Sequence, residues 1–214
     1  MVFVTIVCYT MVENLYTTFN SKVELSRAVN SNIPLAIMPC KQPIELLNLM
    51  TIVVSSKLNI TFELEVSSAY QDLKKILEDK LDLHNNSSLN LWLQHMNMAV
   101  DMFASIEKLS SVAIRLSTQR VCQKFHVDKV NYRMLVTYFG KGTEWAPITL
   151  SDHLLKSNSN FEDLGCKTNF IKPWDIALFK GGSEGFLHRT PVLALQSNSI
   201  LFKLDNPNFL RRLK

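Results

Sequence analysis

The chain lacks the sequence features that mark several common protein classes. Its four cysteines, Cys8, Cys40, Cys122 and Cys166, include no Cys-x-x-Cys pair, so neither a zinc knuckle nor a disulfide framework is indicated. The net charge is +4, but no dense basic stripe with interleaved aromatic residues accompanies it, which argues against nucleic-acid binding. We therefore expect reduced thiols, a cytoplasmic location and no nucleic-acid partner.

Long apolar segments are also missing. The first twelve residues are apolar, but a segment of that length is too short to span a bilayer. They also lack the basic leading segment and small-residue cleavage site of a signal peptide. We interpret residues 1–32 as an amino-terminal extension and expect no membrane association.

What is present describes an ordinary globular protein. The chain has 214 residues, of which 47% are apolar and 20% are charged, a composition that allows one domain with a sizeable core. Helical patterns dominate from about residue 33 to 110, and strand and turn patterns dominate from about 111 to 207. The sequence therefore predicts a single α+β domain over residues 33–214.

Apolar spacing predicts two long helices in the first half. A helix after Ser67-Ser68 carries an apolar stripe through Leu73 and Leu77, and its lysines predict a solvated outer face. A longer helix from Leu89 to Leu109 carries methionines at core positions, which favours an adaptable packing seam over a cofactor site. We expect this stripe to pack against a sheet, because an isolated helix gains little from its propensity alone.

The second half reads as strands separated by turns. Tyr132–Tyr138, Ile176–Phe179 and Ser199–Asp205 are the clearest strands, and Gly140-Lys-Gly142 predicts a turn after the first of them. The polar stretch from Asp152 to Asn160 is interpreted as a mobile loop.

The stretch with the most chemistry is Phe125-His-Val-Asp128. On an extended strand, His126 and Asp128 project from the same face and can share one metal ion. His188 is the best candidate for a third ligand. Two histidines and a carboxylate leave three positions open on an octahedral ion, which suits non-haem Fe(II). A bare His-x-Asp is common, and without its context a surface pair or a strand cap is the simpler interpretation.

The surrounding order resembles the double-stranded β-helix, or jelly-roll, of the Fe(II)/2-oxoglutarate-dependent oxygenases. Residues from about Val112 to Asp205 more closely resemble the uncharacterised family called domain of unknown function 1826. The matching segments are Phe125–Asp128, Tyr132–Tyr138, Gly142-Thr-Glu-Trp145, Asp175–Gly181 and His188-Arg-Thr-Pro191. The resemblance implies a jelly-roll core beneath the helices and a metal triad of His126, Asp128 and His188.

It also implies an iron enzyme that uses 2-oxoglutarate and O₂ to hydroxylate or demethylate an unknown small-molecule or protein substrate. Such enzymes usually hold the co-substrate's distal carboxylate with an Arg or Lys at the start of the final strand, where this chain reads Gln196-Ser-Asn-Ser199. Arg133 is the first substitute, because a charged residue in an apolar strand is costly to bury unless paired. Lys203 is a second, although it also reads as a solvated strand residue, and Arg189, directly after His188, is a third. Tyr138 is expected to line the pocket or to pack in the barrel.

Two alternatives stay open at this point. The same ligands would accept Zn²⁺ with a water as the fourth, so a non-catalytic zinc protein in metal homeostasis fits the motif. A cupin-type metalloenzyme that does not use 2-oxoglutarate fits it as well. The sequence does not decide the oligomeric state.

Overall fold

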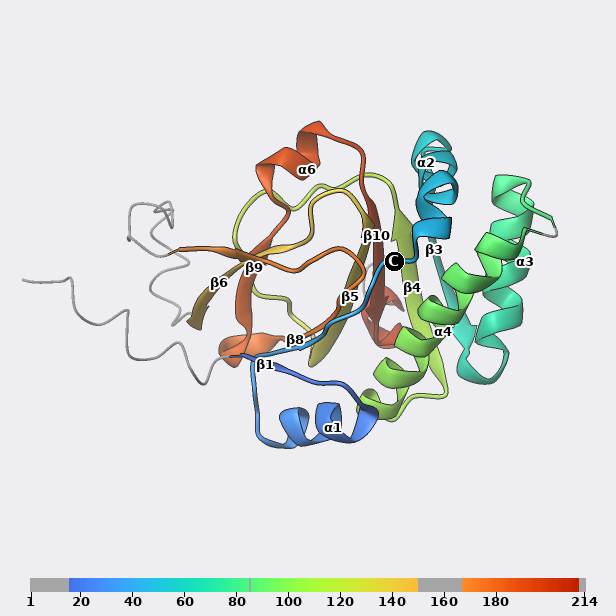
Figure 1. Cartoon of the computed structure of the whole chain (residues 1–214). Coiled ribbons are helices and arrows are strands. Elements are labelled where there is room, and N and C mark those ends of the chain that lie inside the picture. Colours follow the sequence, from blue (N-terminus) through green and yellow to red (C-terminus); the bar gives the residue numbers. More distant parts are fainter. Residues whose placement is uncertain (1–15, 85, 150–166, 212–214) are drawn as a thin grey trace, which may run out of the picture.

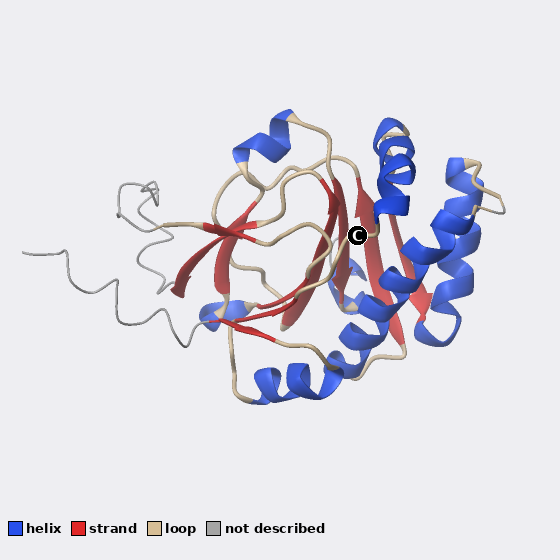
Figure 2. Cartoon of the chain, in the orientation of Figure 1, coloured by secondary structure: helices blue, strands red, loops and turns tan. Residues whose placement is uncertain are grey.

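The computed structural model describes residues 16–84, 86–149 and 167–211. The expectations for the first twelve residues and for Asp152 to Asn160 therefore lie outside the described residues. Strands and helices combine into a mixed α/β architecture built around a large, mainly antiparallel sheet (Figures 1 and 2). None of the helices in the described ranges is long and apolar enough to cross a membrane.

The strands form two sheets. The large one has seven strands in the order β1-β2-β8-β5-β10-β4-β3, and the small one has three in the order β7-β6-β9. Only the β1–β2 pair of the large sheet is parallel. The bounds are Tyr16–Thr18 (β1), Leu35–Met38 (β2), Asn59–Glu65 (β3), Ser111–Ser117 (β4), Tyr132–Phe139 (β5), Glu144–Thr149 (β6), Asn169–Phe170 (β7), Ile176–Lys180 (β8), Phe186–Arg189 (β9) and Ile200–Asp205 (β10).

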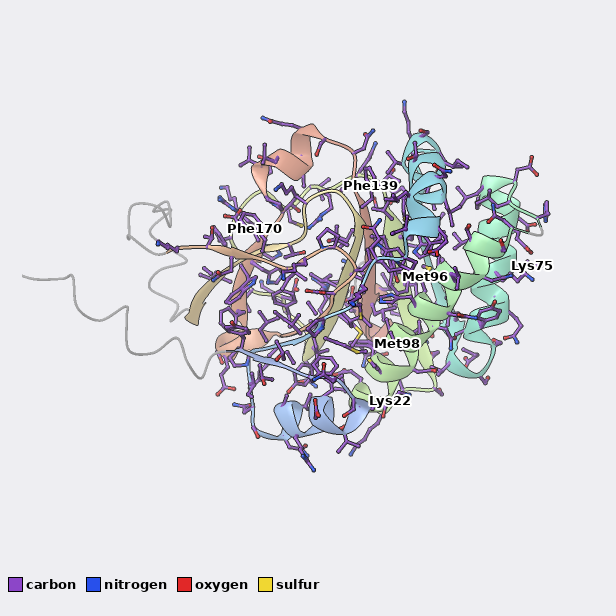
Figure 3. The ribbon with its side chains drawn as sticks, viewed as in Figure 1. Lys22, Lys75, Met96, Met98, Phe139 and Phe170 are labelled. Carbon is purple, nitrogen blue, oxygen red and sulfur yellow. The ribbon has the colours of Figure 1, made fainter. Side chains whose placement is uncertain are left out.

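The helices α2, α3 and α4 lie on the side of the large sheet that faces away from the small sheet (Figure 1). Asn86 caps α4 by accepting a hydrogen bond from the Leu89 amide at 3.1 Å. The lysine-rich face of α3 is solvated, with Lys75 on its outer side (Figure 3). The bounds are Lys22–Asn30 (α1), Leu47–Ser55 (α2), Ala69–Leu81 (α3), Ser87–Glu107 (α4), Val192–Gln196 (α6) and Pro207–Arg211 (α7), with short 3₁₀ turns at Ile44–Leu46, Val66–Ser68 and Gly182–Glu184.

The two faces of the large sheet serve different cores. One face packs against the helices, where the methionine seam of α4 buries Met96 and Met102 as expected from its spacing. The other face packs against the small sheet through a separate cluster that includes Leu135, Phe179 and Phe186. Because successive strand residues point to opposite faces, β5 supplies Met134 to the first cluster and Leu135 to the second.

Residues 16–32, which were expected to form an amino-terminal extension, are part of this arrangement. β1 pairs with β2 and extends the large sheet, and the α1 residues Leu25 and Ala28 belong to the helix-side core. Ser21 caps α1 by accepting a hydrogen bond from the Glu24 amide at 3.2 Å. This segment therefore packs with the elements that follow it.

Candidate metal centre

The three residues predicted as metal ligands lie together beside the small sheet. His126 forms an isolated antiparallel bridge with His188 of β9. The His126 amide donates to the His188 carbonyl at 3.1 Å, and the His188 amide donates to the His126 carbonyl at 3.0 Å. Asp128 follows in the turn that leads to β5. Two segments that are 62 residues apart in sequence are thus held side by side by their own main chains.

The ligand atoms of this triad face one another. His126 Nε2 is 3.7 Å from Asp128 Oδ1, and His188 Nε2 is 3.1 Å from Asp128 Oδ2. One ligand atom from each residue lies within 4.8 Å of the others. These separations allow one ion to contact all three residues.

Each imidazole is oriented by a carbonyl of its own segment. His126 Nδ1 lies 2.9 Å from the Lys124 carbonyl oxygen, and His188 Nδ1 lies 3.0 Å from the Phe186 carbonyl oxygen. Since a carbonyl only accepts, Nδ1 carries the proton in both rings and Nε2 keeps its lone pair. Asp128 Oδ2 is buried and receives no well-aligned hydrogen bond. A cation is the partner that fits two lone pairs and a carboxylate.

The charges around Asp128 favour its ionised form. Burial alone would raise the pKa of this carboxyl, but His188, Arg133 and His126 together lower the pKa to about 2. Burial lowers the pKa of His126, and the neighbouring His188 lowers it further, which favours the neutral imidazole that a metal requires.

The lowered pKa of Asp128 is therefore expected to make the folded protein less stable as the pH falls into the acid range. Its pKa in the folded protein, about 2, lies below its ordinary value of 3.8. The resulting stabilisation of about 2 kcal/mol is present above the ordinary value and is lost as the pH falls through the lower one. In metal-free protein, the unfolding free energies of wild type and Asp128→Asn should therefore converge by about this amount between pH 5 and pH 2. Denaturant titrations at both pH values measure it, and a constant difference contradicts the assignment.

Arg133 lies behind the triad, on β5. Its Nε donates to Asp205 Oδ1 at 2.6 Å, and its NH1 donates to Asp128 Oδ1. The guanidinium also lies over the Phe209 ring, 5.0 Å from the ring centroid. Arg133 is 7% exposed, and the two carboxylates compensate the burial of its charge. Arg133, predicted to hold the co-substrate, thus holds the Oδ1 atom of Asp128.

A pocket opens beside the triad. His126 and His188 form part of its wall, together with five cationic side chains and no carboxylate among the described lining residues. The remaining wall is mixed polar and apolar. The lining residues are Arg115, Ser117, Gln119, Arg120, Val121, Cys122, His126, Arg133, Leu135, Thr143, His188, Arg189, Thr190, Leu201 and Lys203.

Lys203 is on the pocket wall, which differs from its interpretation as a solvated strand residue. Its side chain is 20% exposed, and its ammonium lies 3.5 Å from Asp205 Oδ2. Burial lowers the pKa of this lysine, and nearby Arg133 lowers it further. The final strand β10 begins at Ile200 and presents Leu201 and Lys203 to the pocket. The basic residue of this strand therefore stands later than the Gln196–Ser199 region where one was expected.

Tyr138 is on the opposite face of β5 from Arg133 and does not line this pocket. It is fully buried in the helix-side core, where its hydroxyl lies 3.0 Å from His95 Nδ1 and its ring packs edge-on against Trp174. Of the two roles considered for Tyr138, aromatic packing is the one that the structure has. The alternation of side chains along β5 gives the reason, because even and odd positions face different cores.

Glu144 and Arg189 form an ion pair that the sequence did not predict. Glu144 is 5% exposed. Arg189 Nε and NH2 donate to its two carboxylate oxygens at 2.7 and 3.1 Å. The Arg189 guanidinium also lies 4.3 Å from the centroid of the Phe125 ring. This pair links β6 to β9 next to the ligand His188.

Arg120 and Thr143 are pocket residues that sequence reasoning missed. Arg120 lies in the irregular segment between β4 and His126, and Thr143 ends the glycine turn before β6. Thr143 belongs to the matching segment Gly142-Thr-Glu-Trp145, but Arg120 belongs to no recognisable motif. The one available signal was an arginine in the loop that leads directly to a candidate metal ligand.

Comparison with known proteins gives one family and several distant structural likenesses. The family described as "Protein of unknown function (DUF1826)" matches residues 20–205, a longer stretch than the Val112–Asp205 region expected from the motifs. Curated proteins give no match to this chain.

Three solved structures illustrate the distant likenesses. A bsmA homolog from Methylobium petroleophilum PM1 has a TM-score of 0.49 and 10% identity, over 87% of this chain and 94% of that chain. A full-length Neurospora crassa protein in complex with alpha-KG has a TM-score of 0.45 and 10% identity, over 92% and 86%. The non-heme alpha ketoglutarate dependent epimerase SnoN from nogalamycin biosynthesis has a TM-score of 0.41 and 9% identity, over 86% and 80%. With TM-scores below 0.5, these likenesses carry no weight for function.

Proposed function

Because the chain belongs to the DUF1826 family of proteins of unknown function, its activity has to be inferred from the site, and we propose that it is a mononuclear non-haem Fe(II)/2-oxoglutarate-dependent oxygenase. The observation that carries this proposal is the His126, Asp128 and His188 cluster beside a pocket with a cationic wall. Two histidines and one carboxylate that leave positions open are the ligand set preferred by Fe(II) oxygenases. We further propose that the two facing sheets form a double-stranded β-helix around this site.

The donor set fits a divalent metal. Both Nε2 atoms keep their lone pairs because both Nδ1 atoms face carbonyl oxygens, and the Asp128 carboxylate is ionised at neutral pH. Arg133 holds Asp128 Oδ1 from behind and leaves Oδ2 for the ion. Such partners behind the ligands orient them and tune the metal.

The pocket fits an anionic co-substrate. The five cations of its wall exceed the three carboxylates, Asp128, Asp205 and Glu144, that pair with some of them. This surplus would stabilise a dicarboxylate next to the ion. When bound, Fe(II) and 2-oxoglutarate supply the dioxygen activation and oxidation chemistry, while the protein supplies binding, orientation and exclusion of water.

The chain's own residues would divide these tasks. His126, Asp128 and His188 would hold the metal, and Arg133 would keep Asp128 ionised and oriented. Arg133 and Lys203 share the Asp205 carboxylate, which lies between them on the wall beneath the triad. The substrate to be hydroxylated or demethylated would enter through the open side of the pocket.

We expect anaerobically purified, Fe(II)-loaded protein to convert 2-oxoglutarate to succinate and CO₂ when O₂ is admitted, with added ascorbate supplying the two electrons that a substrate would otherwise give. Because His126 supplies one of three ligands, His126→Ala should lower this rate to background. Succinate formation is measured by mass spectrometry, and 2-oxoglutarate-dependent charge-transfer absorbance is recorded in parallel.

The exposed residue His84 offers a matched control, since its side chain is 59% exposed in a loop away from the triad. His84→Ala should retain the wild-type rate. Absence of both succinate and the charge-transfer band in wild-type protein would reject the oxygenase proposal. Tight zinc binding without either signal would instead support a zinc protein, since affinity order alone favours zinc over Fe(II).

A further inference from the structure

Arg120 is a buried cation whose charge has no carboxylate partner within residues 16–84, 86–149 and 167–211. It is 9% exposed. Its NH1 donates to the Lys141 carbonyl at 3.3 Å, and its NH2 donates to Thr143 Oγ1 at 3.2 Å. Its Nε is buried without a hydrogen-bond acceptor. The guanidinium is thus held in place by neutral groups while its positive charge stays uncompensated.

Three of the other four cations of the pocket have carboxylate partners. Arg133 pairs with two carboxylates, Arg189 pairs with Glu144, and Lys203 pairs with Asp205. Burial lowers the pKa of Arg120 to about 10, which reflects the cost of removing this charge from water. A buried charge with an orphaned donor calls for an explanation, and a missing anion supplies one.

Main-chain pairing places Arg120 on the pocket wall at some distance from the metal ligands. The His126–His188 bridge continues to Cys122, whose carbonyl accepts from the Thr190 amide at 2.7 Å. Two residues of extended chain cover roughly 7 Å, so the step from His188 to Thr190 moves away from the metal site by about the length of a short dicarboxylate. Arg120 precedes Cys122 by two residues, on the side away from His126, and lines the same pocket.

The turn that holds Arg120 has no room for larger residues in place of its two glycines. A Cβ at Gly142 would meet the Ile171 carbonyl oxygen at 1.7 Å, and Gly140 has a φ of +82° that favours glycine. These glycines let residues 140–143 fold tightly between β5 and β6. The acceptors on Lys141 and Thr143 are therefore fixed, and they fix the guanidinium.

We propose that Arg120 binds the carboxylate of 2-oxoglutarate that is remote from the metal, in place of a basic residue at the start of the final strand. The first pocket-facing residue of that strand is Leu201, which carries no charge. Lys203 and Arg133 share Asp205 and are partly neutralised by it. Arg120 alone among these three has no such competitor in the described part of the chain. This inference deepens the proposed function and rests on it.

Binding of 2-oxoglutarate to Mn(II)-loaded protein tests the assignment without turnover. Titration calorimetry under nitrogen should give an affinity that falls by about 10- to 100-fold in Arg120→Gln, because charge-assisted hydrogen bonds are lost. Mn(II) affinity should stay within about twofold of wild type, since Arg120 contacts no triad residue, and a larger drop is attributed to a disturbed fold.

Three further variants sharpen this test. Arg120→Lys keeps the charge and should recover part of the lost affinity. Arg27→Gln removes one charge from the exposed face of α1 and should change nothing. Lys203→Gln removes the competing cation, and a loss of 2-oxoglutarate affinity in it, with none in Arg120→Gln, would overturn the proposal. Should Arg120→Gln prove misfolded by circular dichroism, Arg120→Lys takes its place, with a smaller loss expected.

Failure of this inference can be told apart from failure of the oxygenase proposal. If wild-type protein binds 2-oxoglutarate and Arg120→Gln binds it equally well, the role of Arg120 is refuted while the function stands. If wild-type protein binds Mn(II) but no 2-oxoglutarate, both are refuted. Glutarate, which lacks the metal-chelating keto group, should compete with 2-oxoglutarate in wild type and not in Arg120→Gln, and equal competition in both also refutes the role of Arg120.

Discussion

Replacing His188 with alanine is expected to lower the affinity for a divalent metal by well over about 100-fold. Loss of residues that merely support ligands already costs about 10- to 100-fold in affinity, and His188 is itself one of three donors. His188 is 4% exposed, and its Nε2 lies 3.1 Å from Asp128 Oδ2. Competition with a fluorescent chelator measures the affinity for Mn(II), Fe(II) and Zn²⁺ under nitrogen.

The exposed His84 again supplies the control, because His84→Ala removes an imidazole without touching the triad. Circular dichroism establishes that His188→Ala stays folded. A folded His188→Ala protein with wild-type metal affinity would show that the metal, if any, binds elsewhere. The His126, Asp128 and His188 cluster would then be a structural hydrogen-bonded group.

Replacing Arg133 with methionine is expected to destabilise the metal-free protein by about 3 to 5 kcal/mol, the cost typical of removing one partner from a buried ionic group. The change leaves Asp128 and Asp205 buried with like charges and no cation between them. Urea unfolding at pH 7 measures the loss. Because protonation removes that repulsion, the loss should be smaller at pH 4 than at pH 7.

Arg27→Met is the matched control, since this arginine is exposed on α1 and surface substitutions of this kind usually stay within about 0.5 kcal/mol. The double variant Arg133→Met with Asp205→Asn should recover part of the stability, because it removes one of the two carboxylates that had lost the guanidinium. An Arg133→Met protein as stable as wild type would mean that the guanidinium is not needed to compensate these charges.

Local patterns were sufficient to place most elements. The apolar stripe of the helix expected over Leu89–Leu109 predicted α4 and its packing on a sheet, and the pattern in Ser199–Asp205 predicted β10. These segments follow simple periods because each has one buried face. The triad residues could also be named from the sequence, since His126 and Asp128 are two residues apart and His188 lies in a later segment that matches the same family.

Local patterns could not show which face of each strand meets the metal centre. The odd spacing between Arg133 and Tyr138 puts them on opposite faces of β5, but β5 is buried on both faces, so its sequence does not show which of the two faces the site. Lys203 looked solvated because its place on the pocket wall arises only when β10 lies between β4 and β5. Arg120 was missed for a similar reason, because its partners come from the turn after β5.

The main-chain bridge between His126 and His188 bears on how the protein would acquire its metal. The two hydrogen bonds are made by backbone groups alone, so the ligands are brought together by folding rather than by the ion. A site assembled in this way cannot use folding to select among metals, and intrinsic affinity places Zn²⁺ above Fe(II). Correct loading would then depend on which ion is supplied first and on how slowly a wrong one leaves.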